Sequence, residues 1–196
     1  MNALLTAALL DREGRIVGQA VARRGCWQAP LHALRIRHGV VTNVRAVRTP
    51  FDGRWTASRR GPFNCLAAWP DLDLALIGSC RTTHASRPYT PARLEIGGSV
   101  VVVFCWPGAE EIVVRRLEAR VLAAGRTASG LPPGQTFALR PPWLSRALVI
   151  SLRAQEGMSG ALVTNRSGQV VAHLTGYARA CAGYAVALAL PGVRAH

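Results

Sequence analysis

Short apolar segments separated by turn residues run along almost the whole chain, and this pattern restricts the fold more than any other feature. The segment TAALL is followed by DREG and then RIVGQAVA, which predicts a β-hairpin because Gly14 can adopt the positive φ of a tight turn. Comparable segments follow along the chain, among them CWQAP, RWTASRR, GGSVVVVFCW, GALVTN and VVAHLTGYA. Many short strands with frequent turns predict an all-β protein, and two antiparallel barrels packed together suit this pattern.

A polar segment without periodicity divides the strands into two groups. It reads CRTTHASRPYTP from Cys80 to Pro91, and its two prolines favour a connector. We therefore predict an N-terminal barrel over 1–80, a connector over 81–95 and a C-terminal barrel over 96–196.

One segment of the second half fits two secondary structures. EEIVVRRLEARVLAAG, which ends at Gly125, is rich in residues that favour a helix. Ile112, Val113 and Val114 are β-branched, however, and the neighbouring segments have the pattern of strands. We expect a strand here.

The charge balance is strongly basic. All 24 basic residues are Arg, against 10 acidic residues, which gives a net charge of +14. We favour a GC-rich coding sequence as the explanation of this usage, and the alternative is a surface that attracts nucleic acid or acidic peptides. Because the arginines are spread from Arg12 to Arg194 without a long basic run, the sequence predicts at most weak nucleic-acid binding at low salt.

The five cysteines are odd in number, lie far apart and form no CxxC pair. This spacing argues against a zinc site and against a disulfide framework, so we expect reduced thiols, no metal and no cofactor. The opening MNALLTAALL lacks the basic start and the cleavage site of a signal peptide, and no apolar run is long enough to span a bilayer. We expect a cytoplasmic protein, in the host cytoplasm if the source is viral, that is not secreted and has no membrane segment.

The stretch EGMSGALVTNRSGQVVAHLTG, from Glu156 to Gly176, places Ser159 between two glycines. A nucleophilic serine needs an exposed hydroxyl and nearby amides that stabilise a developing oxyanion, and glycines let the backbone present them. Gly157 and Ser159 would supply these two amides. An ordinary hairpin turn is the alternative, because Gly and Ser are common in turns.

A serine nucleophile also requires a base and a group that orients the base. Asp73 stands at the head of the apolar strand in DLDLALIGS, and Asp71 is the competing carboxylate. Two histidines precede this strand at a suitable distance, His32 in CWQAPLHAL and His38 in RIRHGVV. The residues alone leave both histidines open.

Together these motifs resemble trypsin-like serine proteases of the compact bacterial (HtrA-like) or viral type. PDLDLALIGS is similar to their Asp-bearing strand, EGMSG…GQVV to their nucleophile loop and following hairpin, and AGYAVAL to their closing strand. The resemblance covers roughly residues 5 to 192 and implies two six-stranded barrels with the active site between them. It implies a polypeptide substrate and a triad of Ser159, Asp73 and His32, although Pro30 and Leu31 depart from the family's usual TAAH.

The resemblance also suggests where the side chain before the cleaved bond would bind. Arg153, six residues before the serine, and His173, fourteen after it, would favour Glu or Gln, as in picornavirus-type proteases that process polyproteins. Aligning on Gly168 instead would place Leu174 in the pocket and favour a small apolar residue. Two other functions compete: a non-catalytic protease-like scaffold that binds RNA or protein through its arginines, and an unrelated all-β binding module.

Overall fold

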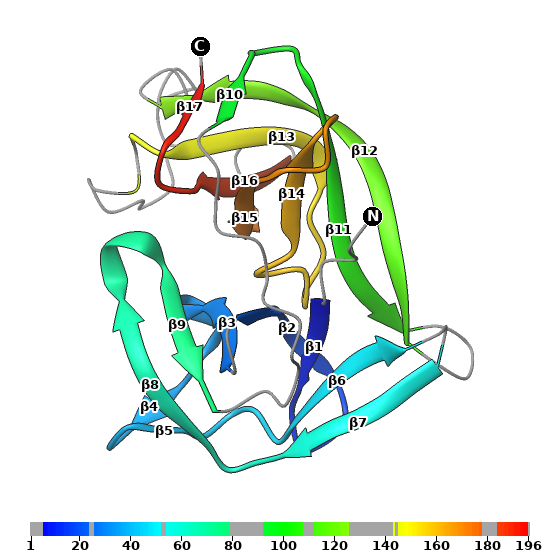
Figure 1. The fold of residues 1–196 in the computed structure, drawn as a ribbon, viewed down its shortest axis with the longest axis vertical. Coiled ribbons are helices and arrows are strands. Elements are labelled where there is room, and N and C mark those ends of the chain that lie inside the picture. The colour runs from blue at the N-terminus through cyan, green and yellow to red at the C-terminus, as the bar shows by residue number, and fades with distance from the viewer. Residues whose placement is uncertain are drawn as a thin grey trace. The chain divides into compact units, whose positions relative to one another are not determined.

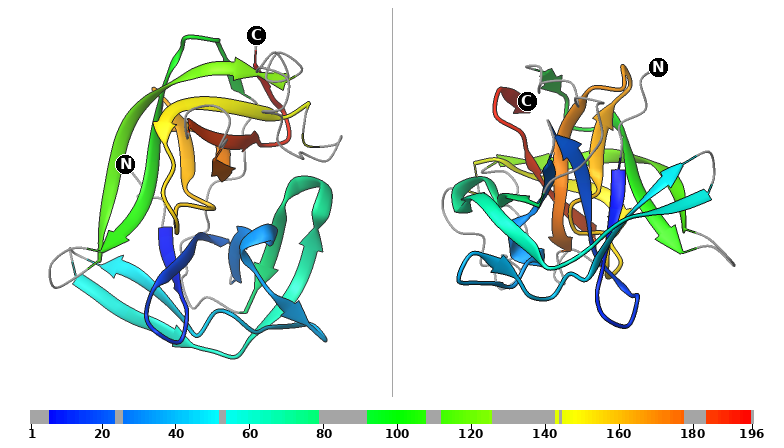
Figure 2. Two further views of the ribbon diagram at one scale, coloured as in Figure 1. Left: turned by 180° about the vertical axis from the view of Figure 1, so that it is seen from behind. Right: turned by 60° about the horizontal axis from the view of Figure 1, so that its bottom comes forward.

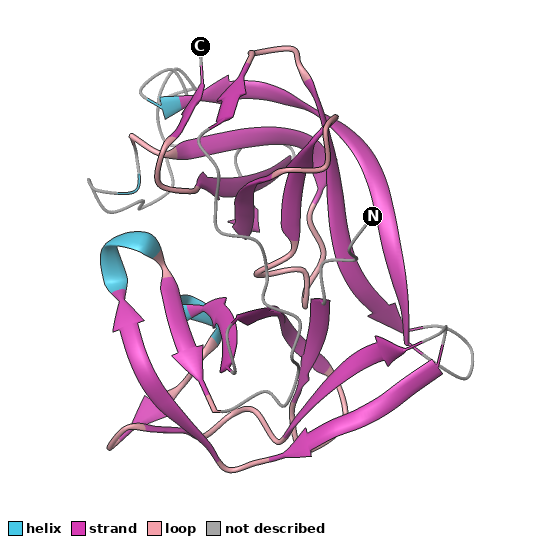
Figure 3. Ribbon diagram, viewed as in Figure 1, coloured by secondary structure: helices cyan, strands magenta, loops and turns pink. Residues whose placement is uncertain are grey.

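The computed structural model describes residues 6–23, 26–51, 54–78, 92–107, 112–125, 143, 145–177 and 184–195 (Figure 1). Strands make up nearly all of the regular structure, interrupted by two short 3₁₀ helices, η1 (Leu31–Ala33) and η2 (Pro70–Leu72) (Figure 3). The predicted all-β class is therefore confirmed. No helix among the described residues is long and apolar enough to cross a membrane.

The chain divides into two compact units. Unit 1 contains Met1–Arg87, Phe104–Arg115 and Glu156–Ala161, and unit 2 contains Pro88–Val103, Arg116–Gln155 and Leu162–His196. The predicted boundaries treated each half as one continuous segment. In the structure, unit 1 also contains Phe104–Arg115 and Glu156–Ala161 from the second half, and most of the predicted connector lies outside the described residues. The predicted boundaries stay a prediction.

Unit 1 is built on a nine-stranded sheet with the order β4-β5-β8-β9-β3-β2-β1-β6-β7. Its strands are β1 (Thr6–Leu10), β2 (Ile16–Arg23), β3 (Cys26–Pro30), β4 (Ile36–Arg37), β5 (Val40–Val41), β6 (Ala46–Phe51), β7 (Arg54–Arg60), β8 (Phe63–Trp69) and β9 (Leu74–Ile77). Leu9, Trp27, Phe63 and Ile77 are at most 1% exposed and form the centre of its core. Burying each such side chain contributes about 1.5–3 kcal/mol, so these strands hold the sheet in one register.

Unit 2 holds most of a closed six-stranded barrel with the order β11-β12-β13-β16-β15-β14, coloured green to red in Figure 2. The barrel strands are β11 (Ser99–Pro107), β12 (Ile112–Ala124), β13 (Ala147–Arg153), β14 (Leu162–Asn165), β15 (Val170–Tyr177) and β16 (Tyr184–Ala189). A parallel pair, β10 (Ala92–Leu94) and β17 (Val193–Ala195), adds a second small sheet. The expected strand at residues 112–124 is confirmed, so β-branched residues and strand neighbours outweigh helix propensity there.

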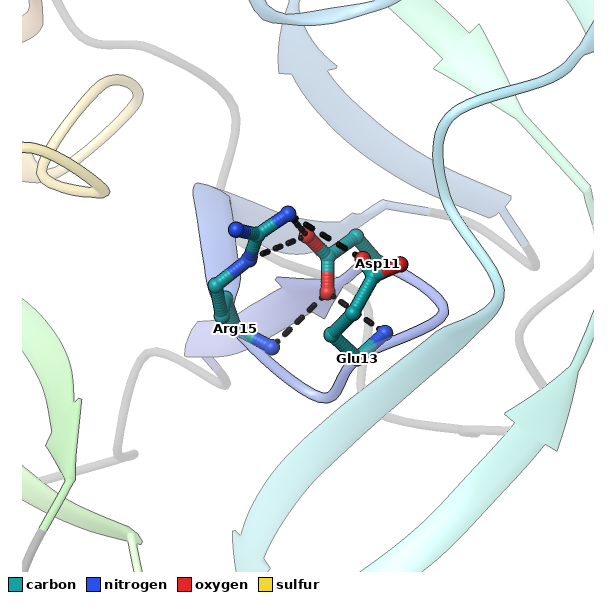
Figure 4. A network of polar contacts seen from close by, with 3 residues as sticks. All are labelled: Asp11, Glu13 and Arg15. Carbon is teal, nitrogen blue, oxygen red and sulfur yellow. Dashed lines mark hydrogen bonds and ion pairs between the residues drawn. The ribbon is translucent and has the colours of Figure 1, made fainter.

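The predicted hairpin between β1 and β2 is present, and one acidic side chain organises its turn (Figure 4). Asp11 Oδ1 accepts hydrogen bonds from the amides of Glu13 (3.0 Å) and Arg15 (2.9 Å), while Asp11 Oδ2 pairs with the Arg15 guanidinium at 2.8 Å. Gly14 has φ 79°, as the tight turn requires. The Arg15 guanidinium also reaches Glu13 at 3.1 Å.

Candidate active site

The turn that carries Ser159 belongs to unit 1, although it connects β13 to β14 in the sequence. The Ala161 amide donates to the Met158 carbonyl at 2.9 Å and closes the turn. Met158 is 2% exposed, whereas Ser159 is partly exposed. The buried methionine therefore anchors the turn while the serine hydroxyl remains accessible.

The two glycines beside Ser159 are required by packing as well as by backbone conformation. Gly157 and Gly160 have φ of 86° and 88°. A Cβ at Gly157 would lie 2.7 Å from the Ile16 carbonyl oxygen, and one at Gly160 would lie 2.5 Å from that of Gln19. The turn thus rests directly on β2, where no side chain fits beneath it.

His32 lies in η1, immediately after β3. The amide of Leu31 donates to the backbone carbonyl of Asp73 at 3.0 Å, and the amide of His32 donates to Asp73 Oδ1 at 2.9 Å. Asp73 ends η2 in a left-handed conformation (φ 52°, ψ 40°) and is 1% exposed. These bonds bring the backbone before β9 against the backbone after β3, so the carboxylate and the imidazole meet.

Three side chains form a chain of hydrogen bonds within unit 1. His32 Nδ1 lies 2.6 Å from Asp73 Oδ2, and His32 Nε2 lies 2.9 Å from Ser159 Oγ. Since an ionised carboxylate only accepts hydrogen bonds, it places the imidazole proton on Nδ1 and leaves the Nε2 lone pair facing the serine hydroxyl. This is the arrangement of nucleophile, base and orienting group that activates a serine.

The alternative candidates lie elsewhere. His38 is exposed at the turn between β4 and β5, with φ 48°, and forms no hydrogen bond with the described residues. Asp71 is exposed within η2. Of the two histidines and two carboxylates that the sequence left open, the structure therefore brings His32 and Asp73 to Ser159. The sequence departure at Pro30 does not prevent this geometry.

The two amides that the sequence assigned to oxyanion stabilisation are available. Among the described residues, neither the Gly157 amide nor the Ser159 amide has a hydrogen-bond acceptor. The carbonyls of the same two residues are both occupied: Gln19 Nε2 donates to Gly157 O at 2.8 Å, and the Gln19 amide donates to Ser159 O at 2.7 Å. Gln19 was not predicted from the sequence, where its only signal is a polar residue inside the apolar segment IVGQAVA.

A cavity of about 660 Å³ opens in unit 1 beside the serine turn. It is lined by Asp11, Arg12, Glu13, Arg15, Ile16, Val17, Arg35, Thr42, Asn43, Trp106, Pro107 and Glu156. The ion pairs of Figure 4 therefore form part of its wall. Burial acts to raise the pKa of Asp11, but the backbone and side-chain hydrogen bonds from Arg15 outweigh it, so this pKa lies below its ordinary value.

The residues suggested for substrate recognition belong to unit 2. Arg153 ends β13 and is exposed, so the charge that it offers is solvated. His173 and Leu174 lie in β15 and are 3% and 1% exposed, and His173 is opposite Leu162 and Leu188 in the sheet. Their role in substrate binding stays a prediction.

The cysteines that the structure describes form no disulfide with one another. Cys26 and Cys65 are partly buried and Cys105 is buried, while Cys80 and Cys181 lie outside the described residues. Within the described part of the chain, no three His, Cys, Asp or Glu side chains gather as a metal site would need.

No protein-family model matches this chain, and no curated protein matches its sequence. Solved structures do match. The MamO protease domain from Magnetospirillum magneticum aligns with a TM-score of 0.62 at 17% identity over 95% of this chain and 90% of that one. A protease from M. tuberculosis in its active form gives 0.62 at 17% identity, covering 95% and 75% of the two chains. Tobacco etch virus protease complexed with product gives 0.57 at 8% identity, covering 97% and 74%.

The chain has the chymotrypsin-like fold. The expected architecture is thereby confirmed, with bacterial and viral proteases among the similar structures. In this chymotrypsin-like protein one half is a closed six-stranded barrel, and the other is the nine-stranded sheet of mostly short strands rather than six longer ones. At identities this low the similarity shows the fold alone, and a fold does not by itself determine the chemistry of its site.

Proposed function

We propose that this chain is a serine endopeptidase that cleaves polypeptides through an acyl-enzyme. The observation that carries the proposal is the position of His32, with Nε2 2.9 Å from Ser159 Oγ and Nδ1 2.6 Å from Asp73 Oδ2. The fold supports it, because similar solved structures are named as proteases.

In the proposed reaction, Ser159 Oγ attacks the carbonyl carbon of a peptide bond while His32 Nε2 accepts the hydroxyl proton. Asp73 holds the imidazole orientation and stabilises its positive charge. The amides of Gly157 and Ser159 bind the oxyanion, and one such donor is worth about 10²–10³ in rate. His32 then gives the proton to the leaving amine, and a water molecule, activated in the same way, hydrolyses the acyl-enzyme and frees Ser159.

Two preferences at the cleaved bond follow from the two alignments of β15. A Glu or Gln preference depends on His173 and Arg153, and a small apolar preference depends on Leu174. Because Arg153 is exposed, its attraction for an acidic side chain would be screened and would weaken with salt. Profiling a peptide library on wild-type protein and on His173→Ala distinguishes the two preferences. A preference for Glu or Gln before the cleaved bond would suit a viral protease that processes a polyprotein.

The test of the proposed activity is labelling with a fluorophosphonate probe, which reacts rapidly only with an activated serine. We expect rapid labelling of the wild-type protein and none of Ser159→Ala. Ser167→Ala is the matched control, since Ser167 also precedes a glycine of positive φ on an exposed turn but lies in the hairpin between β14 and β15. Equal labelling of wild-type and Ser159→Ala protein would contradict the proposal and favour a non-catalytic scaffold.

Nucleic-acid binding stays a prediction from net charge. Exposed arginines occur in both units, for example Arg37 and Arg48 in unit 1 and Arg166 and Arg194 in unit 2. Binding to generic RNA at low salt, falling steeply as salt rises, would support it.

A further inference from the structure

Gln19 is a fully buried polar residue in the middle of β2. Its side chain is 1% exposed, and each polar atom of its amide has a partner. Oε1 accepts from the Cys105 amide at 2.8 Å, while Nε2 donates to the carbonyls of Cys105 at 3.1 Å and Gly157 at 2.8 Å. The orientation of the side-chain amide is therefore unambiguous, because the donor of Cys105 must face Oε1 and the two carbonyls must face Nε2.

The backbone of Gln19 adds a second link to the serine turn, because its amide donates to Ser159 O at 2.7 Å. One residue thus holds the carbonyls of Gly157 and Ser159, the two residues whose amides lack an acceptor among the described residues. A glycine has the widest choice of backbone angles, so a turn that begins at Gly157 needs an external restraint to keep its amides aimed at one point. The Nε2 bond provides that restraint.

A purely space-filling role does not explain this residue. Burying a side-chain amide costs free energy that an apolar side chain of the same size does not, and the neighbours Ala20, Val21 and Ala22 are apolar and buried. The amide recovers that cost only through its three hydrogen bonds, one of which ends on Gly157. The bonds to Cys105 in β11 fix the side chain, so that its remaining proton points at the serine turn.

We propose that Gln19 is a positioning residue for the oxyanion hole. Its side-chain amide, oriented by the backbone of Cys105, holds the Gly157 carbonyl and thereby directs the neighbouring Gly157 amide toward the reacting carbonyl oxygen. This inference rests on the proposed function. In this role Gln19 contacts neither the substrate nor the catalytic side chains, and it acts only through the backbone of the turn that carries Ser159.

The test compares Gln19→Met, which keeps the volume and removes the donor, with Thr6→Val as the matched control. Thr6 is 2% exposed, and its hydroxyl contacts Cys105 Sγ at 3.6 Å, so Thr6→Val perturbs the same part of the core without touching the turn. With a fluorogenic casein peptide, we expect kcat of Gln19→Met to fall about tenfold to hundredfold with KM unchanged, somewhat less than removing an oxyanion donor outright. Thr6→Val should keep its kcat within twofold.

A pH series on Gln19→Glu separates positioning from general stability. A neutral Glu can still accept from Cys105 and donate to Gly157, whereas a carboxylate cannot donate, and burial raises the pKa of such a carboxyl. The rate of Gln19→Glu relative to wild type should therefore fall as pH rises. The same ratio for Thr6→Val should be flat.

Amide hydrogen exchange gives a readout that does not depend on activity. Segment 155–161 should exchange faster in Gln19→Met and at the wild-type rate in Thr6→Val. Unchanged exchange there, or a wild-type kcat in Gln19→Met, would overturn the inference while leaving the protease assignment intact. If wild-type protein fails to label with the fluorophosphonate, the protease assignment fails, and the exchange result still decides whether Gln19 holds the turn.

Discussion

The ring of Pro30 packs directly against Gly160: a Cβ on that glycine would lie 2.6 Å from Pro30 Cδ. Pro30 ends the strand before His32, and Gly160 directly follows Ser159. The contact therefore sets how closely the segment carrying His32 approaches the segment carrying Ser159. Pro30, one of the two residues at which this chain departs from the motif that it resembles, is thus built into the site.

Replacing Gly160 with alanine tests this contact. The new methyl group would meet the Gln19 carbonyl at 2.5 Å and the Pro30 ring at 2.6 Å, in a backbone conformation that alanine adopts poorly. We expect a loss of about 2–4 kcal/mol in the free energy of unfolding, measured in urea, together with loss of fluorophosphonate labelling.

Gly168→Ala is the control for Gly160→Ala, because Gly168 also has positive φ (76°) but has no atom within 4 Å of a new Cβ. It should cost only about 1 kcal/mol and leave labelling unchanged. Equal effects of the two changes would show that backbone conformation alone matters.

His32→Ala should lower the rate of peptide cleavage by several orders of magnitude, because it removes the only imidazole within hydrogen-bond distance of Ser159 among the described residues. His38→Ala is the control and should retain the wild-type rate, since His38 is exposed on another turn. Steady-state cleavage of a casein peptide measures both. Loss of activity in His38→Ala alone would mean that the base has been assigned to the wrong histidine.

Asp73→Asn should lower kcat by about 10⁴. An asparagine would donate to His32 Nδ1 and place the imidazole proton on Nε2, where it faces the serine hydroxyl and cannot accept its proton. Asp71→Asn, on the exposed face of η2, should leave kcat unchanged. If Asp73→Asn retains wild-type kcat while Asp71→Asn does not, the orienting carboxylate is Asp71.

The Cys105 thiol should be unreactive in the folded protein. Burial raises its pKa from 9.0 to about 11, with the hydrogen bond to Thr6 acting in the opposite direction, and only the thiolate reacts with disulfide reagents. At pH 8, mass mapping after brief treatment with such a reagent should find Cys26 and Cys65 modified and Cys105 intact until urea is added. Modification of Cys105 at the same rate as Cys26 would contradict its burial.

The same raised pKa gives a direction for stability against pH. The folded state favours the neutral thiol, so the contribution of Cys105 to stability is fully present below pH 9.0 and is lost as pH rises toward about 11. We therefore compare the midpoints of alkaline unfolding after each protein is referred to its own stability at pH 7. The midpoint of Cys105→Ala should then lie at higher pH than that of the wild-type protein. An identical alkaline midpoint in the two proteins would show that another group controls it.

Much of the strand pattern could be predicted from local sequence, because alternation, β-branched residues and turn glycines act over a few residues. Strand β8 (Phe63–Trp69) was not predicted, because its apolar residues do not mark a buried face. Leu66 is 58% exposed and Trp69 is 43% exposed. Gln19 was missed for a related reason, since its partners Cys105 and Gly157 lie 86 and 138 residues away.

The sequence by itself determined the all-β class, the position of the serine between two glycines and a carboxylate at the head of an apolar strand, since each depends on neighbouring residues. The residues alone left both His32 and His38 open, and only the resemblance favoured His32, because which histidine meets Ser159 depends on pairing over long separations. His32 is 41 residues from Asp73 and 127 from Ser159. In the register of β3 against β9, Pro30 lies opposite Leu74. Only this register places His32, which follows β3, beside Asp73, which precedes β9. The tertiary structure therefore brought His32 rather than His38 to Ser159, and it did so through the hydrogen bonds and packing that fix this register.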